Sequence, residues 1–181
     1  MKNFFSNNTK RSFLVTMLSI GLLSASLSVN ADGVSVNFKL NNSSNNEVRI
    51  DNVRLVNGWT LSPKLDGLTI EAKDPSSHSF VWTQTDGFGG GYLGFNFVAS
   101  GETVGEVIYY DVDFPGQYGF DCDTDTNNLG ISIYYSGDFF DGATFMVVPK
   151  SVVPAGYTSC MSPSQFAEAK KELMEKIRKK K

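Results

Sequence analysis

Short runs of alternating apolar and polar residues, broken by turn residues about every eight to twelve positions, constrain this chain most. The first run places Val34, Val36, Phe38 and Leu40 on one face. Similar runs cover 48–56, 68–72, 79–85, 92–99, 105–112, 130–135 and 143–148. A period of two is typical of half-buried strands. The sequence therefore predicts an all-β fold, a single β-sandwich of about eight or nine short antiparallel strands.

The breaks between these runs predict where the chain turns. We expect an irregularity at Asp51-Asn52 within the second run, and a turn at Asn57-Gly58. Residues 59–63 and 121–128 are predicted to be loops, 74–77 a turn, and 86–91 a glycine-rich link.

The first 31 residues have the pattern of an export signal. Lys2, Lys10 and Arg11 are followed by an uncharged, mostly apolar stretch from Phe13 to Leu23, and small or short residues end at Ala31. The stretch is too short to cross a bilayer of ~30 Å as a helix. We expect 1–31 to be a signal peptide, 32–160 the sandwich and 161–181 a helix. The protein is then secreted or periplasmic; the alternative is a retained N-terminal anchor.

Two cysteines, Cys122 and Cys160, follow the predicted signal. In an oxidising compartment such a pair most simply forms one disulfide. The alternative, metal binding by two isolated cysteines, is the less favoured of the two.

Charge is distributed unevenly along the chain after the predicted signal. Residues 165–181 carry seven basic and three acidic side chains, whereas 32–164 carry six basic and sixteen acidic ones. A body with a formal net charge of −10 argues against nucleic acid as a partner, because phosphates require a basic face.

The C-terminal residues have a helical pattern. Ser162 is a candidate N-cap, followed by Pro163 and by Gln165 at the third position. Phe166, Ala169, Leu173 and Ile177 then recur at helical spacing. This amphipathic, basic helix either packs on the sandwich, or binds a membrane surface or a partner, or stays disordered.

The chain lacks the side chains of common catalytic sites. His78 is the only histidine, so a three-histidine zinc site is excluded, and it lies in a polar turn pattern without the glycines of a nucleophile elbow. The acidic run from Asp121 to Asp125 has neither the glycine nor the glutamate of an EF-hand loop at the required positions. We expect no enzymatic activity, no metal site and no cofactor.

Several short motifs, in a fixed order, resemble the aegerolysin family, in particular its bacterial members related to crystal-associated insecticidal proteins. The resemblance covers about 36–149. The motifs are Leu40-Asn41-Asn42-Ser43, Asn57-Gly58-Trp59, Pro63, Ile70, Thr85-Asp86-Gly87-Phe88, Gly91, Gly94, Tyr109, Phe114-Pro115-Gly116, Tyr118, Cys122 and Ser136-Gly137-Asp138. The predicted export signal and the basic C-terminal helix depart from the family pattern.

The resemblance implies a β-sandwich that binds membrane lipids through aromatic loops, in some members together with a larger partner protein that forms pores. It implies lipid contact for Trp59, Phe88, Tyr92, Tyr109, Phe114 and Tyr118. The sequence adds Phe139 and Phe140, which lie between two aspartates in a predicted loop. Such aromatic side chains suit a membrane interface, although most aromatic residues of a strand-rich chain belong to its core.

The sequence leaves three candidate functions open. The first is a secreted lipid-binding sandwich, a component of a pore-forming or insecticidal toxin system. The second is a carbohydrate- or protein-binding module that uses the same aromatic rings. The third is a small hydrolase that uses carboxylates, which the missing catalytic pattern disfavours.

Overall fold

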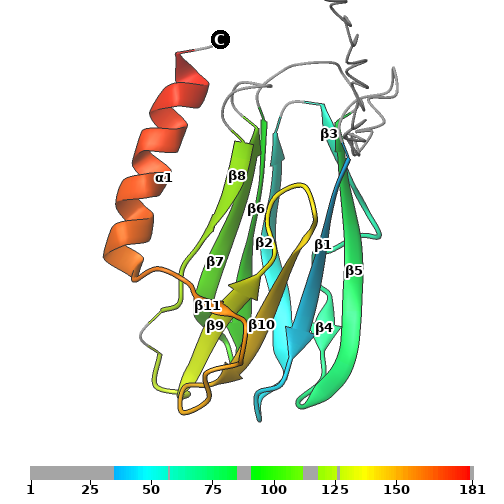
Figure 1. Ribbon diagram of the computed structural model, residues 1–181, viewed down its shortest axis with the longest axis vertical. Coiled ribbons are helices and arrows are strands. Elements are labelled where there is room, and N and C mark those ends of the chain that lie inside the picture. Colours follow the sequence, from blue (N-terminus) through cyan, green and yellow to red (C-terminus); the bar gives the residue numbers. More distant parts are fainter. Residues whose placement is uncertain (1–34, 57, 85–90, 112–117, 126, 180–181) are drawn as a thin grey trace, which may run out of the picture.

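The computed structural model describes residues 35–56, 58–84, 91–111, 118–125 and 127–179, which form two β-sheets and one helix (Figure 1). The predicted signal peptide, the glycine-rich link up to Gly90, Phe88 and Phe114 lie outside these residues. The two sheets confirm the all-β sandwich expected from the sequence. None of the helices among the described residues has the length and apolar character needed to span a bilayer.

The six-stranded sheet has the order β11-β9-β10-β1-β5-β3. Its strands are β11 (Thr158–Ser159), β9 (Ile131–Ser136), β10 (Ala143–Pro149), β1 (Ser35–Asn42), β5 (Asp74–Gln84) and β3 (Trp59–Ser62). Strands β1 and β10 pair in parallel, and the other pairs are antiparallel.

The five-stranded sheet has the order β4-β2-β6-β7-β8 and is antiparallel throughout. Its strands are β4 (Thr69–Ile70), β2 (Val48–Val56), β6 (Gly91–Ala99), β7 (Glu102–Asp111) and β8 (Tyr118–Cys122). The irregularity expected in β2 is confirmed: the β2–β6 register shifts between Asp51 and Arg54, and Asn52 has a positive φ of 54°.

The inner faces of both sheets share one core. The ring of Phe38 on β1 lies 5.3 Å from that of Phe80 in its own sheet, and 5.7 Å from Phe95 and 5.2 Å from Tyr109 in the facing sheet. Alternation places these side chains inward, because successive residues of a strand point to opposite faces.

Three local predictions were wrong. Residues 59–62 form strand β3 rather than a loop, 74–77 begin strand β5 rather than a turn, and Asp121 and Cys122 belong to strand β8. Strands β3 and β8 are at sheet edges, and the first half of β5 is exposed. Such segments need no apolar alternation, so their sequences look like loops.

The helix α1 (Pro163–Arg178) packs on the outer face of the five-stranded sheet (Figure 1). Its buried residues Phe166, Leu173 and Ile177 form a second apolar cluster with Ile108 of β7. Of the alternatives left open by the sequence, the structure has the helix packed on the sandwich. The backbone N–H of Ser162 donates to Gln165 Oε1 at 3.2 Å, which caps the first turn as expected.

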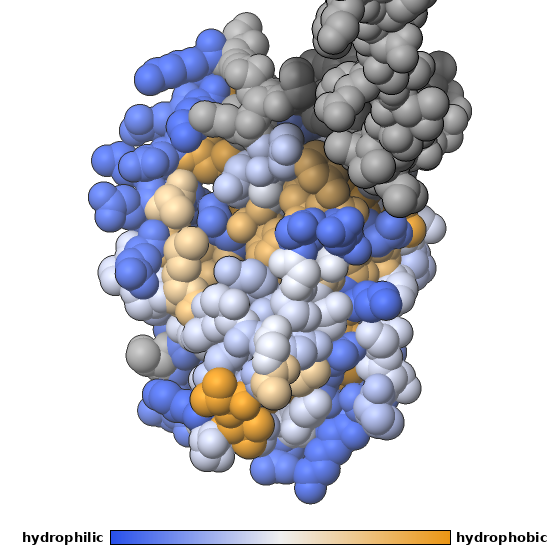
Figure 2. All heavy atoms as spheres, in the orientation of Figure 1, coloured by the Kyte–Doolittle hydropathy of each residue, from blue (hydrophilic) through white to orange (hydrophobic). Residues whose placement is uncertain are grey.

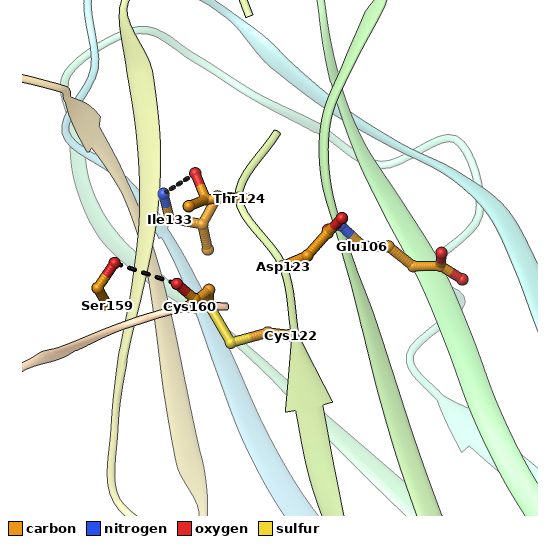
Figure 3. The surroundings of a disulfide bond; sticks show 7 residues. All are labelled: Glu106, Cys122, Asp123, Thr124, Ile133, Ser159 and Cys160. Carbon is orange, nitrogen blue, oxygen red and sulfur yellow. Dashed lines mark hydrogen bonds between the residues drawn. A yellow bond between two sulfur atoms is a disulfide. The ribbon is translucent and has the colours of Figure 1, made fainter. Parts of the chain in front are cut away.

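A disulfide fixes the start of α1. Cys122 at the end of β8 is bonded to Cys160, which directly follows β11 (Figure 3). Beside it, the N–H of Met161 donates to the carbonyl of Cys122 at 2.9 Å, and that of Thr124 to the carbonyl of Met161 at 3.0 Å. The predicted disulfide is therefore confirmed, and it joins the β8 edge to the segment that leads into the helix.

Candidate functional site

Five strands bring aromatic residues to one end of the sandwich. The register places Trp59 opposite Gln84, Gly91 opposite Asp111, and Asp111 opposite Tyr118. The starts of β3, β6 and β8 therefore meet the ends of β5 and β7, at the upper end in Figure 1. We call this end the aromatic end.

The loop between β9 and β10 contributes two phenylalanines. Asp138 Oδ1 accepts the backbone N–H groups of Phe140 at 2.9 Å and Asp141 at 2.8 Å, which closes a tight turn. Gly137 has φ 83°, and a Cβ there would overlap the carbonyl oxygen of Gly142. A side chain at position 137 would therefore force this turn open, and with it the placement of Phe139 and Phe140.

Phe139 and Phe140 meet Tyr118 across the gap between the two sheets. The Tyr118 ring lies 5.4 Å from that of Phe139 and 4.3 Å from that of Phe140. Phe139 is only 5% exposed and also contacts Trp82 and Tyr109 of the core, whereas Tyr118 is 39% exposed. The three rings thus connect the core to the surface.

An open groove of about 510 Å³ lies at this contact, and we call it the aromatic groove. It is lined by Tyr118, Gly119, Phe120, Tyr135, Gly137, Asp138, Phe139 and Phe140. Figure 2 shows hydrophobic residues at the surface in the upper half of the molecule, where Figure 1 places the β9–β10 loop, and a second hydrophobic patch at the lower end. A groove of this size with aromatic walls can hold an apolar or planar group of a ligand.

Not all residues predicted for lipid contact reach the surface. Trp59 is buried and stacks on Trp82 with ring centroids 3.6 Å apart. Tyr109 is also fully buried, and burial raises the pKa of its phenol well above the usual value. Phe139 is the third buried member. These three are core residues in this conformation, so Tyr118 and Phe140 are the predicted residues that line the groove with exposed surface.

The other residues predicted for lipid contact do not line the groove among the described residues. Tyr92 is half-buried on the outer face of β6, where it packs against the apolar cluster under α1. Phe88 and Phe114 lie outside the described residues. Sequence reasoning missed Phe120 and Tyr135, which line the groove. Recognising 118–122 as a strand would have placed Phe120 on the same face as Tyr118.

The groove lining contains no nucleophile–base pair. His78 Nε2 lies 3.0 Å from Asp74 Oδ2 on β5, and this hydrogen bond lowers the pKa of Asp74 to about 2. Neither residue lines the groove. Across the described part of the chain, no three His, Cys, Asp or Glu side chains are grouped as metal ligands.

The fold and the groove together define a β-sandwich protein with an aromatic groove at one end. Two solved structures share the fold. IP-1A from Alcaligenes faecalis has a TM-score of 0.51 and 15% sequence identity, over 67% of this chain and 95% of that chain. The RahU protein, solved in complex with a Tris molecule, has a TM-score of 0.51 and 12% identity, over 66% of this chain and 97% of that chain.

At these identities, the similarity shows the fold alone. No protein-family model matches the chain, and no curated protein matches it. The matched share of the chain is close to the length of the sandwich without its predicted signal and C-terminal helix.

Proposed function

We propose that this chain is a secreted protein that binds membrane lipids through the aromatic end of its β-sandwich. The observation that carries the proposal is the aromatic groove, where the partly exposed Tyr118 and Phe140 rings meet at 4.3 Å. Aromatic rings with an apolar body, and for tyrosine a polar tip, are favoured at membrane–water interfaces.

Charge supports a preference for lipids with neutral or zwitterionic headgroups. The body of the chain, 32–164, has a formal net charge of −10, which repels anionic bilayers. The basic last turn of α1, with Lys176 and Arg178, lies toward the aromatic end (Figure 1). It supplies local positive charge close to the proposed contact face.

Secretion belongs to the same proposal. Residues 1–31 have the pattern of an export signal. The disulfide between Cys122 and Cys160 fits a chain that matures in an oxidising compartment, because thiols stay reduced in most cytosols.

The sequence resemblance to aegerolysins extends the proposal to a toxin system. It supports a role as the lipid-recognising component of a pore-forming or insecticidal assembly, in which a larger partner protein forms the pore. The sandwich on its own then binds vesicles without releasing their contents.

Co-sedimentation with vesicles of phosphatidylcholine, phosphatidylethanolamine or phosphatidylglycerol tests the lipid proposal. We expect pelleting with the first two, weakened at least about fivefold by Tyr118→Ala or Phe140→Ala because the exposed rings are lost. Val153→Ala is the matched control, since Val153 is the most exposed large apolar residue among those described and lies beyond the opposite end of β10.

The second candidate, a carbohydrate-binding module, is favoured by the combination of Tyr118 and Tyr135 rings with the Asp138 carboxylate in one groove. Retention on an insoluble polysaccharide, with no pelleting on any vesicle, would establish it in place of lipid binding. Loss of vesicle binding on removal of 163–181 alone, with the Tyr118 and Phe140 variants unaffected, would assign lipid contact to α1.

A further inference from the structure

A second cavity, separate from the aromatic groove, lies under the C-terminal helix. Its volume is about 410 Å³, and it opens between α1 and the outer side of β7 and β8. Its walls are Tyr110, Tyr118 and Asp121 from the sheet and Ala169, Glu172, Leu173 and Lys176 from the helix. We call it the helix cavity. Among the described residues, Tyr118 alone lines both the helix cavity and the groove.

Tyr110 and Ala169 shape this space. The Tyr110 ring lies across Gly119 of β8, since a Cβ at that glycine would be 3.0 Å from the Tyr110 hydroxyl oxygen. On the helix, Ala169 offers only a methyl group at the cavity wall. The helix is held against the sheet on either side of this gap by Phe166 and Ile177.

The charged groups of the helix cavity are unpaired. Asp121, Glu172 and Lys176 form no ion pair within the part of the chain that the structure describes. Two carboxylates and one ammonium give the walls a formal charge of −1, and the long Lys176 side chain is exposed and can turn to solvent. Asp121 is half-buried, and burial raises its pKa. Its carboxylate would therefore gain from a cation placed beside it.

The tyrosines add a second attraction for positive charge. The faces of aromatic rings carry negative electrostatic potential and bind ammonium groups, most strongly when solvent is displaced. Tyr110 and Tyr118 stand at the same cavity as the Asp121 carboxylate. A bare metal ion would use oxygen ligands at ~2.0–2.6 Å and would leave most of this volume unfilled.

We propose that the helix cavity binds a small organic ammonium cation, with Asp121 as its counter-ion and the Tyr110 and Tyr118 rings beside it. This site goes beyond the proposed lipid contact at the aromatic groove and does not depend on it. It is formed together with α1, which lies outside the part of the chain that resembles aegerolysins.

Isothermal titration of the full chain with tetramethylammonium and choline tests the proposal. We expect saturable binding of both cations. The neutral choline isostere 3,3-dimethyl-1-butanol should bind at least tenfold more weakly, because it has the same shape without the charge. Equal binding of the neutral isostere, or no binding of either cation, would overturn the proposal.

Two variants locate the site, with a third as a control. Asp121→Asn should weaken choline binding at least tenfold, and Ala169→Leu should abolish it by filling the cavity. Asp66→Asn is the matched control, since Asp66 is an exposed carboxylate in the loop between β3 and β4. If Asp121→Asn lowers the thermal midpoint, the exposed Glu172→Gln serves instead, with a weakening of at least threefold. Unchanged binding in both charge variants contradicts the assignment.

Experiments with vesicles distinguish an ammonium group that belongs to a lipid headgroup from one that belongs to a free cation. If the cavity takes a lipid headgroup, Asp121→Asn loses the preference for phosphatidylcholine over phosphatidylglycerol. If it takes a free cation, choline binds as above and vesicle pelleting is the same for Asp121→Asn and the native chain. Failure of the groove variants to alter pelleting would contradict the proposed function and leave the cavity assignment unaffected.

Discussion

Phe139 has a different role from its neighbour Phe140, although the two are adjacent in one loop. Phe139 turns inward, with its ring 6.3 Å from that of Trp82 and 6.1 Å from that of Tyr109. Phe140 turns outward against the partly exposed Tyr118. The loop is thus anchored to the core by one phenylalanine while it presents the other.

This difference predicts unequal costs of truncation. Phe139→Ala should lower the free energy of unfolding by about 3–5 kcal/mol, because it leaves a cavity among buried rings. Phe140→Ala should cost about 1 kcal/mol or less, because its ring is already partly hydrated. Denaturant unfolding measures both values. Equal losses for the two variants would show that Phe139 is not held in the core.

Asp123 predicts a pH-dependent stability. Burial raises its pKa from 3.8 to about 6, and the charges of Glu106 and Asp125 add to this, while the Glu106 backbone N–H and Lys170 oppose it. Between these two pKa values the folded chain holds a proton that the unfolded chain releases. The free energy of unfolding therefore falls as the pH rises from about 4 to about 6, and the loss persists above pH 6.

Asp123→Asn should remove this penalty while it keeps an oxygen acceptor for the Glu106 N–H group. We expect a gain of about 1 kcal/mol at pH 7.5, after allowance for partial exposure of Asp123, and no gain at pH 4. Urea unfolding at both pH values measures it, with Asp66→Asn as the exposed control. A variant no more stable than the native chain at pH 7.5 contradicts the prediction.

Alternation in the sequence indicates which residues of a strand share a face, but not which face meets the core. Residues 105–112 are predicted to be a strand, and the resemblance to aegerolysins places Tyr109, rather than Tyr110, at the lipid-contact surface. In the structure Tyr109 points into the core, and Tyr110 faces the helix. The choice depends on α1, whose position is set by contacts distant in sequence.

At the scale of elements, the central strands could be predicted, but of the edge strands only β4 lies within a predicted run. Strands β1, β6, β7, β9 and β10 have apolar residues at alternate positions, since one or both faces are buried. Strand β8 has Gly119 and Asp121 on its outer face. Its place follows from pairing with β7, which a single sequence does not reveal. Both cavities border β8, so neither could be predicted.

Helix α1 is held by three kinds of contact. Its apolar residues bury against Ile108, Lys170 Nζ lies 2.8 and 2.9 Å from the two carboxylate oxygens of Glu106, and the disulfide fixes its start. Arg54 also contacts Glu106, so one carboxylate joins two cations from separate elements.

Removal of the disulfide should loosen α1 more than it loosens the sandwich. The chain-entropy argument assigns a loop of 38 positions roughly 3–4 kcal/mol, so the Cys122→Ser, Cys160→Ser double variant should unfold at a lower thermal midpoint. Hydrogen exchange should accelerate mainly in α1. Reductant should lower the thermal midpoint of the native chain but not that of the double variant. A midpoint that reductant leaves unchanged in both proteins would contradict the prediction.

The molecule as a whole is acidic in its sandwich and basic in its last residues. The described sandwich includes most of the sixteen acidic residues of 32–164, while the helix and the residues after it carry the local positive excess. This separation could be predicted from the sequence, because it requires only a count of charged residues. The face of the sandwich on which the helix packs could not be predicted.

Charge separation predicts an unusual salt response. The acidic body is repelled by phosphatidylglycerol vesicles, and salt screens this repulsion. Binding to these vesicles should therefore increase between about 0.05 and 0.5 M salt, because the screening length falls from roughly 10 Å or more to about 5 Å or less. Binding to phosphatidylcholine should be nearly constant. Co-sedimentation at both ionic strengths measures this. Binding to anionic vesicles that decreases with salt would show that the basic helix dominates the contact.

The parallel pairing of β1 with β10 has a consequence for the order in which this protein can form. Phe38 pairs with Ala143 and Asn42 with Val147, so the first strand lacks one neighbour until a strand roughly 100 positions later is available. Contacts this distant in sequence make folding slow. If the chain is secreted as proposed, the late arrival of β10 delays completion of the sandwich until almost all of it has left the ribosome, and the unfinished polypeptide is then in a form suited to translocation.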